Sequence, residues 1–381
     1  MSLVIPKRQA LLLLALVSLL QVAGQSALKT KYNNSRTYSG IEIGSKGVKM
    51  SVIEIGRNAK SSGAFHILKD TTINTDFIYF TEPSFASTLS GAVALYRKAL
   101  TEYNIPSERI FTVVSSGVKM QAEKDNKSAW IERMIRSFRE QTGEPDRKVE
   151  VVDVEKEAML SHVGIIPVSR RYNTFLIDIG SGNTKGGFFP NADSPEFRLF
   201  QLNWGTRSVA NATEKRLETD ASLSNFNKHL QRVLAGAENS EIVYAVNASG
   251  AFSLSDNIAA SGGIAWAVAT LTHPELMNNT IVAVTYEEVK KFSEKLYADF
   301  PSLDAGVLTR GISKDTDRQL AMAEIEKVKK VFDQRSLMSG TGLLLKIMRQ
   351  FESVYDTKTF YLVKNGQVGW VSAYVDDASD H

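Results

Sequence analysis

The sequence contains no cysteine among its 381 residues. Disulfide bonds, thiolate metal sites, thiol nucleophiles and a lipid-modified cysteine are therefore excluded. An excess of one charge sign is also lacking, because 45 lysines and arginines nearly balance 42 acidic residues, for a formal net charge of +3. Without a basic field, the composition gives no reason to expect nucleic-acid binding. Apolar residues at 43% and charged residues at 23% are typical of a folded globular protein.

Long apolar runs are absent after the amino terminus, where Lys7 and Arg8 precede an apolar run over residues 10–23. This run is shorter than the roughly 20 residues that a membrane-spanning helix needs. Small residues occupy the −3 and −1 positions of a cut before Gln25, so we predict a signal peptide over residues 1–24 and an exported, periplasmic or secreted protein. After cleavage no stable membrane span would remain. An uncleaved membrane anchor is the alternative.

Two stretches share a pattern of an apolar strand, an acid, one more apolar residue, a glycine turn and a second strand. The first has Glu42 before the turn Gly44-Ser45-Lys46-Gly47, and the second has Asp178 before Gly180-Ser181-Gly182-Asn183-Thr184. Glycines permit the backbone angles of a tight turn, so each stretch predicts a hairpin. The two copies lie 136 positions apart, a spacing that indicates duplicated domains.

Strands alternate with helices after each hairpin, which predicts an α/β fold of two duplicated lobes with a phosphate-binding cleft between them. We expect a polar leader over residues 25–38, a first lobe over 39–154 and a second lobe over 155–381. The main elements expected in the first lobe are helices over residues 86–103 and 128–141 and strands over 110–114 and 149–154. Those expected in the second lobe are strands over 197–202 and 242–246, helices over 209–217, 223–235, 287–297, 320–332 and 342–351, and a final hairpin that turns at 365–366.

Glycine-rich hairpins can bind phosphate, because backbone N–H groups approach the oxygens closely where side chains are missing. Two hairpins that face one another would form a clamp. Glu42 and Asp178 could then hold a divalent cation, Mg²⁺ or Mn²⁺, beside the phosphates. An ordinary β-turn is the alternative for either hairpin by itself.

Three further stretches favour a phosphate site. The strand expected over residues 242–246 runs into a small-residue turn that contains Ser249 and Gly250. Residues 340–342 predict a glycine turn at a helix start, where free N–H groups favour anions. Glu157 lies in the first turn of a helix at the lobe junction and is a candidate base, although acids in a first turn are usually solvated partners of the helix dipole.

The order of these motifs resembles the exopolyphosphatases and guanosine-pentaphosphate phosphatases, in the superfamily of actin, the sugar kinases and the heat-shock-chaperone ATPases. Their first hairpin reads acid-apolar-Gly-Ser, their junction helix begins Glu-Glu-Ala, and their second hairpin reads Asp-apolar-Gly-Gly-Gly-Ser-Thr. Residues 42–45, 156–158 and 178–184 match these motifs. The stretch over 247–252 is similar to the family's Gly-Ala-Ser-Gly-Thr, and 340–344 to its Pro-Gly-apolar segment. The resemblance covers residues 40–375.

The sequence departs from the family pattern inside both hairpins. Glu42 replaces an aspartate of the first hairpin, and Lys185 replaces an acid of the second. A lysine there either weakens a metal site or adds a cation for an anionic substrate. Lys46, Lys49 and Lys185 could line the path of such a substrate, or be solvated hairpin lysines.

The resemblance implies an exopolyphosphatase-like hydrolase of terminal phosphoanhydride bonds, in which Glu157 accepts a proton from the attacking water and positioning supplies most of the rate. We expect inorganic polyphosphate or another condensed phosphate as the substrate, because an exported enzyme meets little guanosine pentaphosphate or ATP. Alternatives are a non-catalytic phosphate- or nucleotide-binding module and an actin-like filament protein. The sequence leaves a homodimer open. The phosphate ligands implied are Gly44, Ser45, Lys46, Gly180, Ser181, Gly182, Asn183, Thr184, Ser249 and Gly250.

Overall fold

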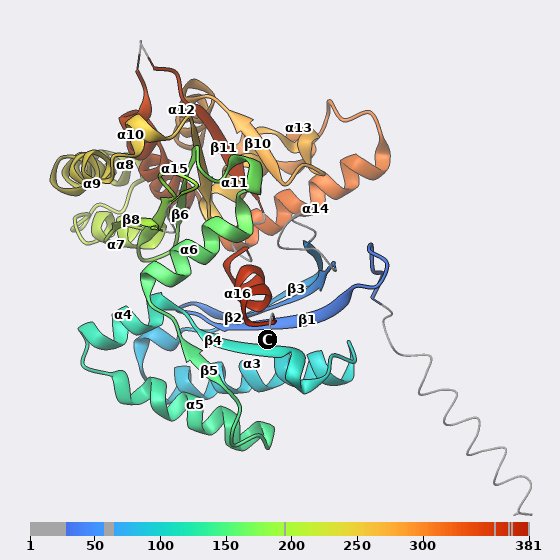
Figure 1. Ribbon diagram of the computed structural model, residues 1–381. Helices are drawn as coiled ribbons and strands as arrows, with labels where there is room; N and C mark the ends of the chain where they lie inside the picture. Colours follow the sequence, from blue (N-terminus) through green and yellow to red (C-terminus); the bar gives the residue numbers. More distant parts are fainter. Residues whose placement is uncertain are drawn as a thin grey trace, which may run out of the picture.

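The computed structural model describes residues 28–56, 65–193, 196–353, 356–364, 366 and 369–379, which form two lobes (Figure 1). The predicted signal peptide lies outside the described residues. Among the helices that are described, none has the length and apolar character needed to cross a membrane.

The first lobe contains a five-stranded sheet in the order β3-β2-β1-β4-β5. Its first two strands form the predicted hairpin, and β4 and β5 run parallel to β1. Helices α3 and α5 pack against one face of this sheet through a common apolar core. The elements are β1 (Arg36–Ile43), β2 (Gly47–Ile55), β3 (Phe65–Asn74), α3 (Glu82–Thr101), β4 (Ile110–Val114), α4 (Ser116–Lys124), α5 (Ser128–Thr142) and β5 (Val149–Val151).

The second lobe repeats this arrangement in a six-stranded sheet of order β10-β11-β9-β6-β7-β8. Strands β8-β7-β6-β9-β11 correspond to β3-β2-β1-β4-β5, with the same pairing directions, and β10 is an addition. The predicted duplicated α/β fold is therefore confirmed. The strands are β6 (Thr174–Ile179), β7 (Thr184–Phe188), β8 (Arg198–Leu202), β9 (Asn257–Ser261), β10 (Ile281–Val284) and β11 (Thr359–Val363).

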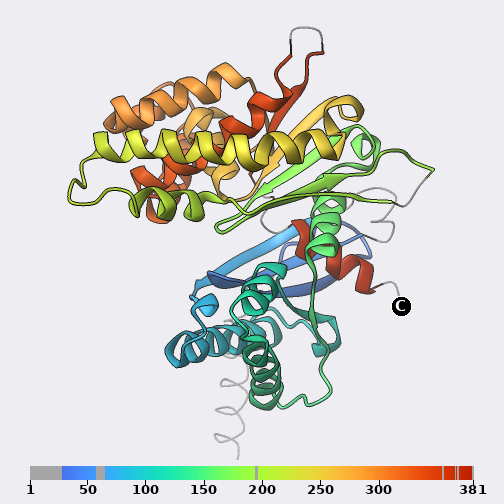
Figure 2. The ribbon, with the colours of Figure 1, turned by 90° about the vertical axis from the view of Figure 1, so that its left-hand side faces the viewer.

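Helices cover the second sheet, as Figure 2 shows from the side. The α-helices described in the second lobe after α6 are α7 (Thr206–Glu214), α8 (Leu223–Ala237), α9 (Val243–Ser249), α10 (Ala251–Leu254), α11 (Gly263–Thr272), α12 (Tyr286–Ala298), α13 (Ala305–Leu308), α14 (Asp315–Val331) and α15 (Gln334–Met348).

The strand predicted over residues 242–246 is wrong. A π-helical turn over Glu238–Ile242 joins α8 to α9, so this segment is helical. Ile242 and Val246 are buried while Tyr244 is 76% exposed. Apolar residues four apart face the core of a helix, whereas β-branched residues had suggested a strand. The strand that pairs with β6 in parallel is β9, which was not predicted.

The glycine turn predicted over residues 340–342 is also wrong, because these residues lie in the middle of α15. A Cβ on Gly340 would lie 2.7 Å from Ile264 Cδ1 of α11 and 2.9 Å from Thr206 Oγ1 of α7. The glycine thus allows close helix packing, and its N–H is not free for an anion.

Two helices lie between the sheets, α6 (Val154–Ile165) and α16 (Gly369–Ser379) (Figure 1). Leu160 of α6 and Trp370 of α16 share an apolar cluster with Val113 of β4. A Cβ on Gly164 would lie 2.1 Å from the carbonyl oxygen of Gly369, so the helices approach closely there. Helix α16, the last helix among the described residues, therefore packs on the first lobe.

The final hairpin predicted to turn at residues 365–366 is wrong. Asn365 lies outside the described residues, and the chain after β11 forms α16 instead of a strand. Trp370 and Tyr374 are four positions apart and both buried, which is helical spacing.

The predicted polar leader is partly structured. Its last residues, from Arg36, begin β1. The amides of Lys31 and Tyr32 donate to the buried Glu54 carboxylate at 2.6 and 2.7 Å, which ties this segment to β2.

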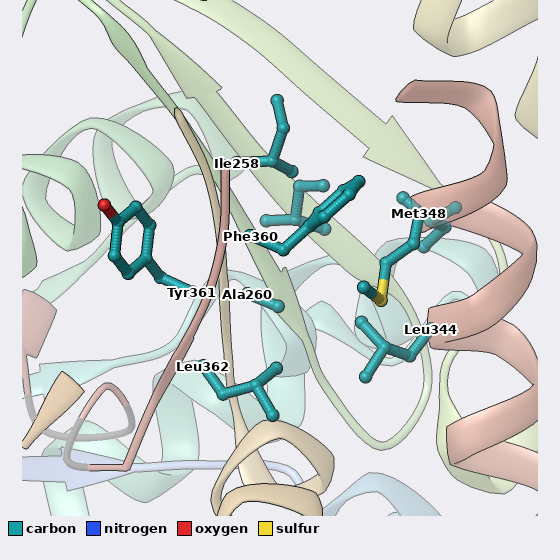
Figure 3. Close-up of a pocket in the computed structure, with 9 residues that line it drawn as sticks. Ile258, Ala260, Leu344, Met348, Phe360, Tyr361 and Leu362 are labelled. Atoms are coloured by element: carbon teal, nitrogen blue, oxygen red, sulfur yellow. The ribbon is translucent and has the colours of Figure 1, made fainter. Parts of the chain in front are cut away.

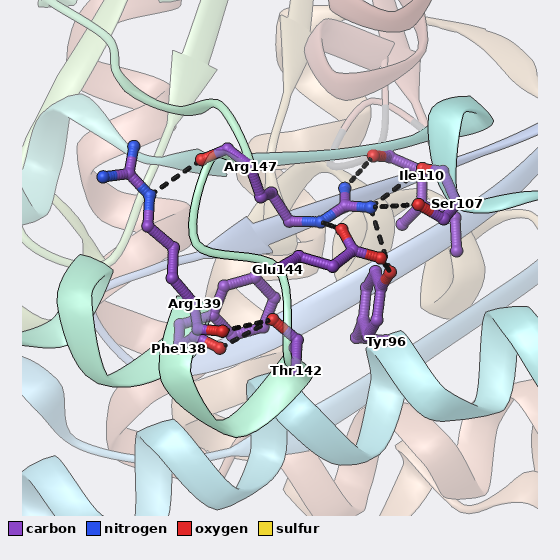
Figure 4. A network of polar contacts seen from close by, with 8 residues as sticks. All are labelled: Tyr96, Ser107, Ile110, Phe138, Arg139, Thr142, Glu144 and Arg147. Atoms are coloured by element: carbon purple, nitrogen blue, oxygen red, sulfur yellow. Dashed lines mark hydrogen bonds and ion pairs between the residues drawn. The ribbon is translucent and has the colours of Figure 1, made fainter.

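A polar network anchors the segment that leads to β5 (Figure 4). Arg147 donates to the carbonyl oxygens of Ile110 at 2.6 Å and Ser107 at 2.9 Å, and it pairs with Glu144. Glu144 also accepts the hydroxyl proton of Tyr96 on α3. These bonds hold α3 against the first residue of β4, Ile110.

Candidate functional site

The first hairpin turns at Gly44, whose N–H donates to the carbonyl oxygen of Gly47 at 2.9 Å. The N–H of Thr75, after β3, donates to Lys46 O at 2.9 Å and fixes the turn from the other side. A Cβ on Gly44 would lie 2.9 Å from Glu42 Oε1. The glycine thus lets the turn approach the acid closely.

The second hairpin closes with the same main-chain bond, from Gly180 N–H to Asn183 O at 3.0 Å. The start of α7 holds this turn, because the N–H groups of Thr206 and Arg207 donate to Gly180 O and Ser181 O at 3.0 and 2.7 Å. Two turns 136 positions apart therefore have the same local geometry.

The buried hydroxyl of Thr184, a predicted phosphate ligand, donates to Trp204 O at 2.7 Å. Lys46, another predicted ligand, is partly exposed, and its ammonium lies 2.8 Å from Asp76 Oδ1. Both side chains thus make a polar contact within the chain.

The two turns meet at the start of α4, a helix that was not predicted. A Cβ on Gly117 would lie 3.0 Å from Ser45 Oγ of the first turn. Asn183 of the second turn lies 4.0 Å, Nδ2 to Sδ, from Met120, less than one helical turn further along α4. We call the two turns, with residues 116–120 of α4, the hairpin junction. Two serines directly after a buried strand were the sequence signal for a helix start here.

Glu157, the predicted base, lies at the hairpin junction. It is buried in the first turn of α6. Its Oε2 accepts the N–H of Ser116 at 2.7 Å, and its Oε1 pairs with the ammonium of Lys185 on β7. The carboxylate therefore connects the start of α4 in the first lobe to the second hairpin.

Glu157 and Lys185 are both charged in this pair. Burial opposes the charged form of Glu157, but the Lys185 ammonium and the Ser116 N–H outweigh it and lower the pKa of Glu157. Burial likewise opposes the charged form of Lys185, and the carboxylates of Glu157 and Asp178 overcome it and raise the pKa of Lys185. Glu157 is ionised at neutral pH and can accept a hydrogen bond, but it is a weak base.

The other two acids have lysines opposite them. In the first hairpin Glu42 faces Lys49 across the strands, with 3.5 Å between Oε2 and Nζ. In the second hairpin Asp178 faces Lys185 in the equivalent register. Burial raises the pKa of Glu42, against the lowering effect of Lys49, and it raises the pKa of Asp178, against that of Lys185.

The end of β9 completes the surroundings of Asp178. Ser261 donates its hydroxyl proton to Asp178 Oδ1 at 3.1 Å, and Gly262 follows with φ +93°. Residues 259–263 at this strand end read Ala-Ala-Ser-Gly-Gly. The stretch over residues 247–252 was expected to be a turn after a strand, but it lies where α9 ends and α10 begins.

Ser249 and Gly250 are not at the hairpin junction. A Cβ on Gly250 would lie 3.3 Å from the side chain of Arg198, where β8 begins. Arg198 pairs with Phe188, whereas the second turn adjoins the opposite end of β7, at Thr184. The structure therefore does not bring these two residues together with the other predicted phosphate ligands.

The side chains at the hairpin junction do not fit the predicted divalent-cation site. A bound Mg²⁺ needs oxygen ligands in a near-octahedral arrangement. Lys49 and Lys185 already lie beside Glu42, Asp178 and Glu157, and an ammonium group repels a second cation. Among the described residues, no three acidic or histidine side chains converge as a metal-ligand group.

Figure 3 shows a small cavity elsewhere, between β9, β11 and α15 in the core of the second lobe. Its lining is apolar apart from Tyr361 and carries no charged side chain. It does not suit a phosphate, and it lies outside the hairpin junction.

No protein-family model matches the sequence, and no curated protein matches it significantly. Solved structures do resemble it. The Aquifex aeolicus member of the Ppx/GppA protein family has a TM-score of 0.62 and 17% identity, over 91% of this chain and 99% of that one. A type II crystal variant of the A. aeolicus Ppx/GppA phosphatase has a TM-score of 0.57, with 18% identity over 88% and 99%. An exopolyphosphatase from Cytophaga hutchinsonii has a TM-score of 0.54, with 15% identity over 90% and 98%.

The match covers almost the full length of each of these structures, so the likeness extends over both lobes and not just over one hairpin. At identities under one fifth, the likeness concerns the fold. The chain has the two-lobed fold of the Ppx/GppA structures, as its collinear hairpin motifs predicted.

Proposed function

We propose that the chain binds the end of a condensed phosphate at the hairpin junction and hydrolyses the terminal phosphoanhydride bond. One observation carries the proposal: a glycine turn from each lobe contacts the start of the same helix, α4, with Glu157 between them. Backbone N–H groups in such turns and at helix starts attract phosphate oxygens. Two of the similar structures are those of a phosphatase and an exopolyphosphatase, which agrees with this chemistry.

In this mechanism the turns hold the terminal phosphoryl group. The attacking water donates a hydrogen bond to Glu157 and gives its proton to this carboxylate as the new P–O bond forms, while the anhydride P–O bond breaks and the shortened polyphosphate leaves. Phosphoryl transfer needs little covalent chemistry from the protein, so positioning and charge stabilisation supply the rate. Lys185 and Ser116 hold the Glu157 carboxylate in one orientation. The predicted Mg²⁺ or Mn²⁺ has no part in this proposal.

We propose inorganic polyphosphate as the substrate and an exported, periplasmic or secreted location, because residues 1–24 have the pattern of a signal peptide. Outside the cytoplasm, nucleotides are scarce. Amino-terminal sequencing of the protein recovered from outside the cytoplasm should begin near Gln25; an intact Met1 on cytoplasmic protein would contradict export.

The test of the proposed activity is phosphate release from polyphosphate, guanosine pentaphosphate and ATP by the chain that begins at Gln25. We expect release from polyphosphate to be fastest. Glu157→Gln should lower this rate by roughly 10²–10⁴, the usual contribution of a positioned base, while binding of polyphosphate changes much less.

A matched control is Glu155→Gln. Glu155 lies two positions earlier in α6 and is exposed, so this substitution makes the same chemical change outside the hairpin junction. It should leave the rate unchanged. Equal rates for the parent and Glu157→Gln would refute the role of Glu157.

The second candidate is a non-catalytic phosphate-binding module. The buried pair of Lys185 with Glu157 favours it, since a base that is paired with an ammonium accepts a proton less readily. Binding of polyphosphate without release of phosphate, with every substrate and added metal, would select this candidate.

A further inference from the structure

Each hairpin carries the same pair of charges in the same register. Glu42 on β1 lies opposite Lys49 on β2, and Asp178 on β6 lies opposite Lys185 on β7. In both copies the lysine follows the acid by seven positions. The duplication therefore includes a cross-strand acid and lysine, one pair for each lobe.

The four hairpin side chains influence one another across the lobes. The carboxylates of Glu42, Asp178 and Glu157 all favour the charged form of Lys185, and Asp178 also favours that of Lys49. Lys185 is 9% exposed, so its ammonium cannot move into solvent while the lobes keep this arrangement. It is a fixed positive charge at the hairpin junction.

A divalent cation at Glu42 and Asp178 would lie among two ammonium groups and three carboxylates. Those carboxylates already have positive partners within the chain, so a metal ion would have to displace a buried lysine or bear its repulsion. Burying a charge that loses its partner is costly. The arrangement thus favours the lysines over the metal.

We propose that Lys185, together with Lys49, takes the place of a divalent cation, so that the hairpin junction binds condensed phosphate without metal. This inference rests on the proposed function, because it concerns the same phosphate site. Lys185 is a positioning residue here: it holds Glu157 ionised and oriented, while the turns contact the phosphate.

The first measurement is calorimetric titration of the chain from Gln25 with inorganic tripolyphosphate, in EDTA and in Mg²⁺. We expect binding to persist in EDTA. The second is titration with Mn²⁺ alone, followed by electron paramagnetic resonance, in which the parent should take up no Mn²⁺. Neither readout needs catalytic activity.

Lys185→Glu should create a metal site, because a carboxylate would then replace the ammonium that lies between Glu157 and Asp178. We expect this variant to bind about one Mn²⁺ and its binding of tripolyphosphate to become sensitive to EDTA. Lys228→Glu makes the same charge change on an exposed residue of α8 and should bind none.

The outcomes separate the two proposals. Binding of tripolyphosphate that is lost in EDTA, or uptake of Mn²⁺ at the hairpin junction of the parent, overturns the metal-free site but keeps the phosphate site. Absence of tripolyphosphate binding in both buffers overturns the proposed function and this inference with it. A folded Lys185→Glu variant that takes up no Mn²⁺ shows that Lys185 does not stand in for the cation. Should this variant fail to fold, the two measurements on the parent decide.

Discussion

Lys185 and Glu157 form an ion pair in which both side chains are nearly inaccessible to water. A buried pair of this kind contributes little net stability, yet either partner alone is costly to bury. Because Ser116 N–H also donates to Glu157, an acceptor must remain at that position. Replacing Lys185 alone should therefore affect stability differently from replacing Lys185 and Glu157 together.

Lys185→Met should lower the free energy of unfolding by about 3–5 kcal/mol, because Glu157 is left buried without its partner. The double variant Lys185→Met with Glu157→Gln should recover most of this loss, since the glutamine is neutral and still accepts the Ser116 N–H. Urea unfolding of the parent, the single and the double variants measures both effects. A double variant no more stable than the single one would show that the pair is not coupled.

His162 should make stability depend on pH. It lies on α6 between Phe189 and Phe197, and its Nε2 donates to Thr174 O at 2.9 Å. Burial lowers its pKa from 6.5 to about 4. As pH falls from 6.5 to about 4, the unfolded chain gains a proton that the folded chain does not.

The free energy of unfolding should therefore decrease by about 3 kcal/mol across this window because of His162, with no further loss from this group below it. His162→Gln keeps a donor for Thr174 O but does not titrate, so its stability should fall less between pH 7 and 4. Unfolding by urea at several pH values tests this. Parallel curves for the two proteins would rule out His162 as the cause.

At the scale of elements, the passage from β9 into α11 shows how a strand end is placed beside a hairpin. Gly262 has φ +93°, and a Cβ there would lie 2.3 Å from Ile179 O and 2.9 Å from Asp178 Oδ1. Both atoms belong to the end of β6. A glycine is required by the backbone angle and by the space.

Gly262→Ala should consequently destabilise the fold by at least about 1–3 kcal/mol, the usual cost of a strained backbone. Tripolyphosphate binding should weaken as well, since Asp178 and the second turn would be displaced. Gly236→Ala is the matched control: Gly236 lies within α8 with free space around it, so alanine there should stabilise by about 0.5–1 kcal/mol. Thermal unfolding and titration calorimetry report the two effects, and equal behaviour of both variants would exclude a special role for Gly262.

At the scale of the whole molecule, the chain passes from the first lobe to the second and returns. Helix α16 packs on the first lobe although β11, which precedes it, belongs to the second. Val375 of α16 contacts the same cluster as Tyr38 and Ile53. The two ends of the described chain are thus held together in one lobe.

Trp370→Ala should lower stability by about 3–5 kcal/mol, as for other large buried aromatic residues. Because Trp370 packs on the first lobe, hydrogen exchange should accelerate most in β1 and β4 and least in β9 and β11. Mass spectrometry of exchanged peptides measures this. Equal acceleration in both lobes would mean that they open as one cooperative unit.

The sequence alone determined the duplicated fold, because a glycine turn and the strand alternation around it are local patterns. The hairpins at Gly44 and Gly180 depend on neighbouring residues for their geometry, and so they could be predicted. The collinear family motifs extended this to both lobes. The prediction of a strand over residues 242–246, where α9 begins, was wrong. A short apolar run with β-branched residues is compatible with a strand or a helix until its packing partners are known.

Which residues meet depends on how the elements pack. Lys185 was predicted to weaken a metal site, to add a cation for an anionic substrate, or to be a solvated hairpin lysine. Its ion pair with Glu157, which joins residues 28 positions apart in different elements, was not predicted. The start of α4 became part of the site because both lobes contact it, and Ser249 and Gly250 were excluded because their helix ends elsewhere. Distances between elements that are far apart in sequence depend on how the sheets and helices pack, and no local pattern contains that information.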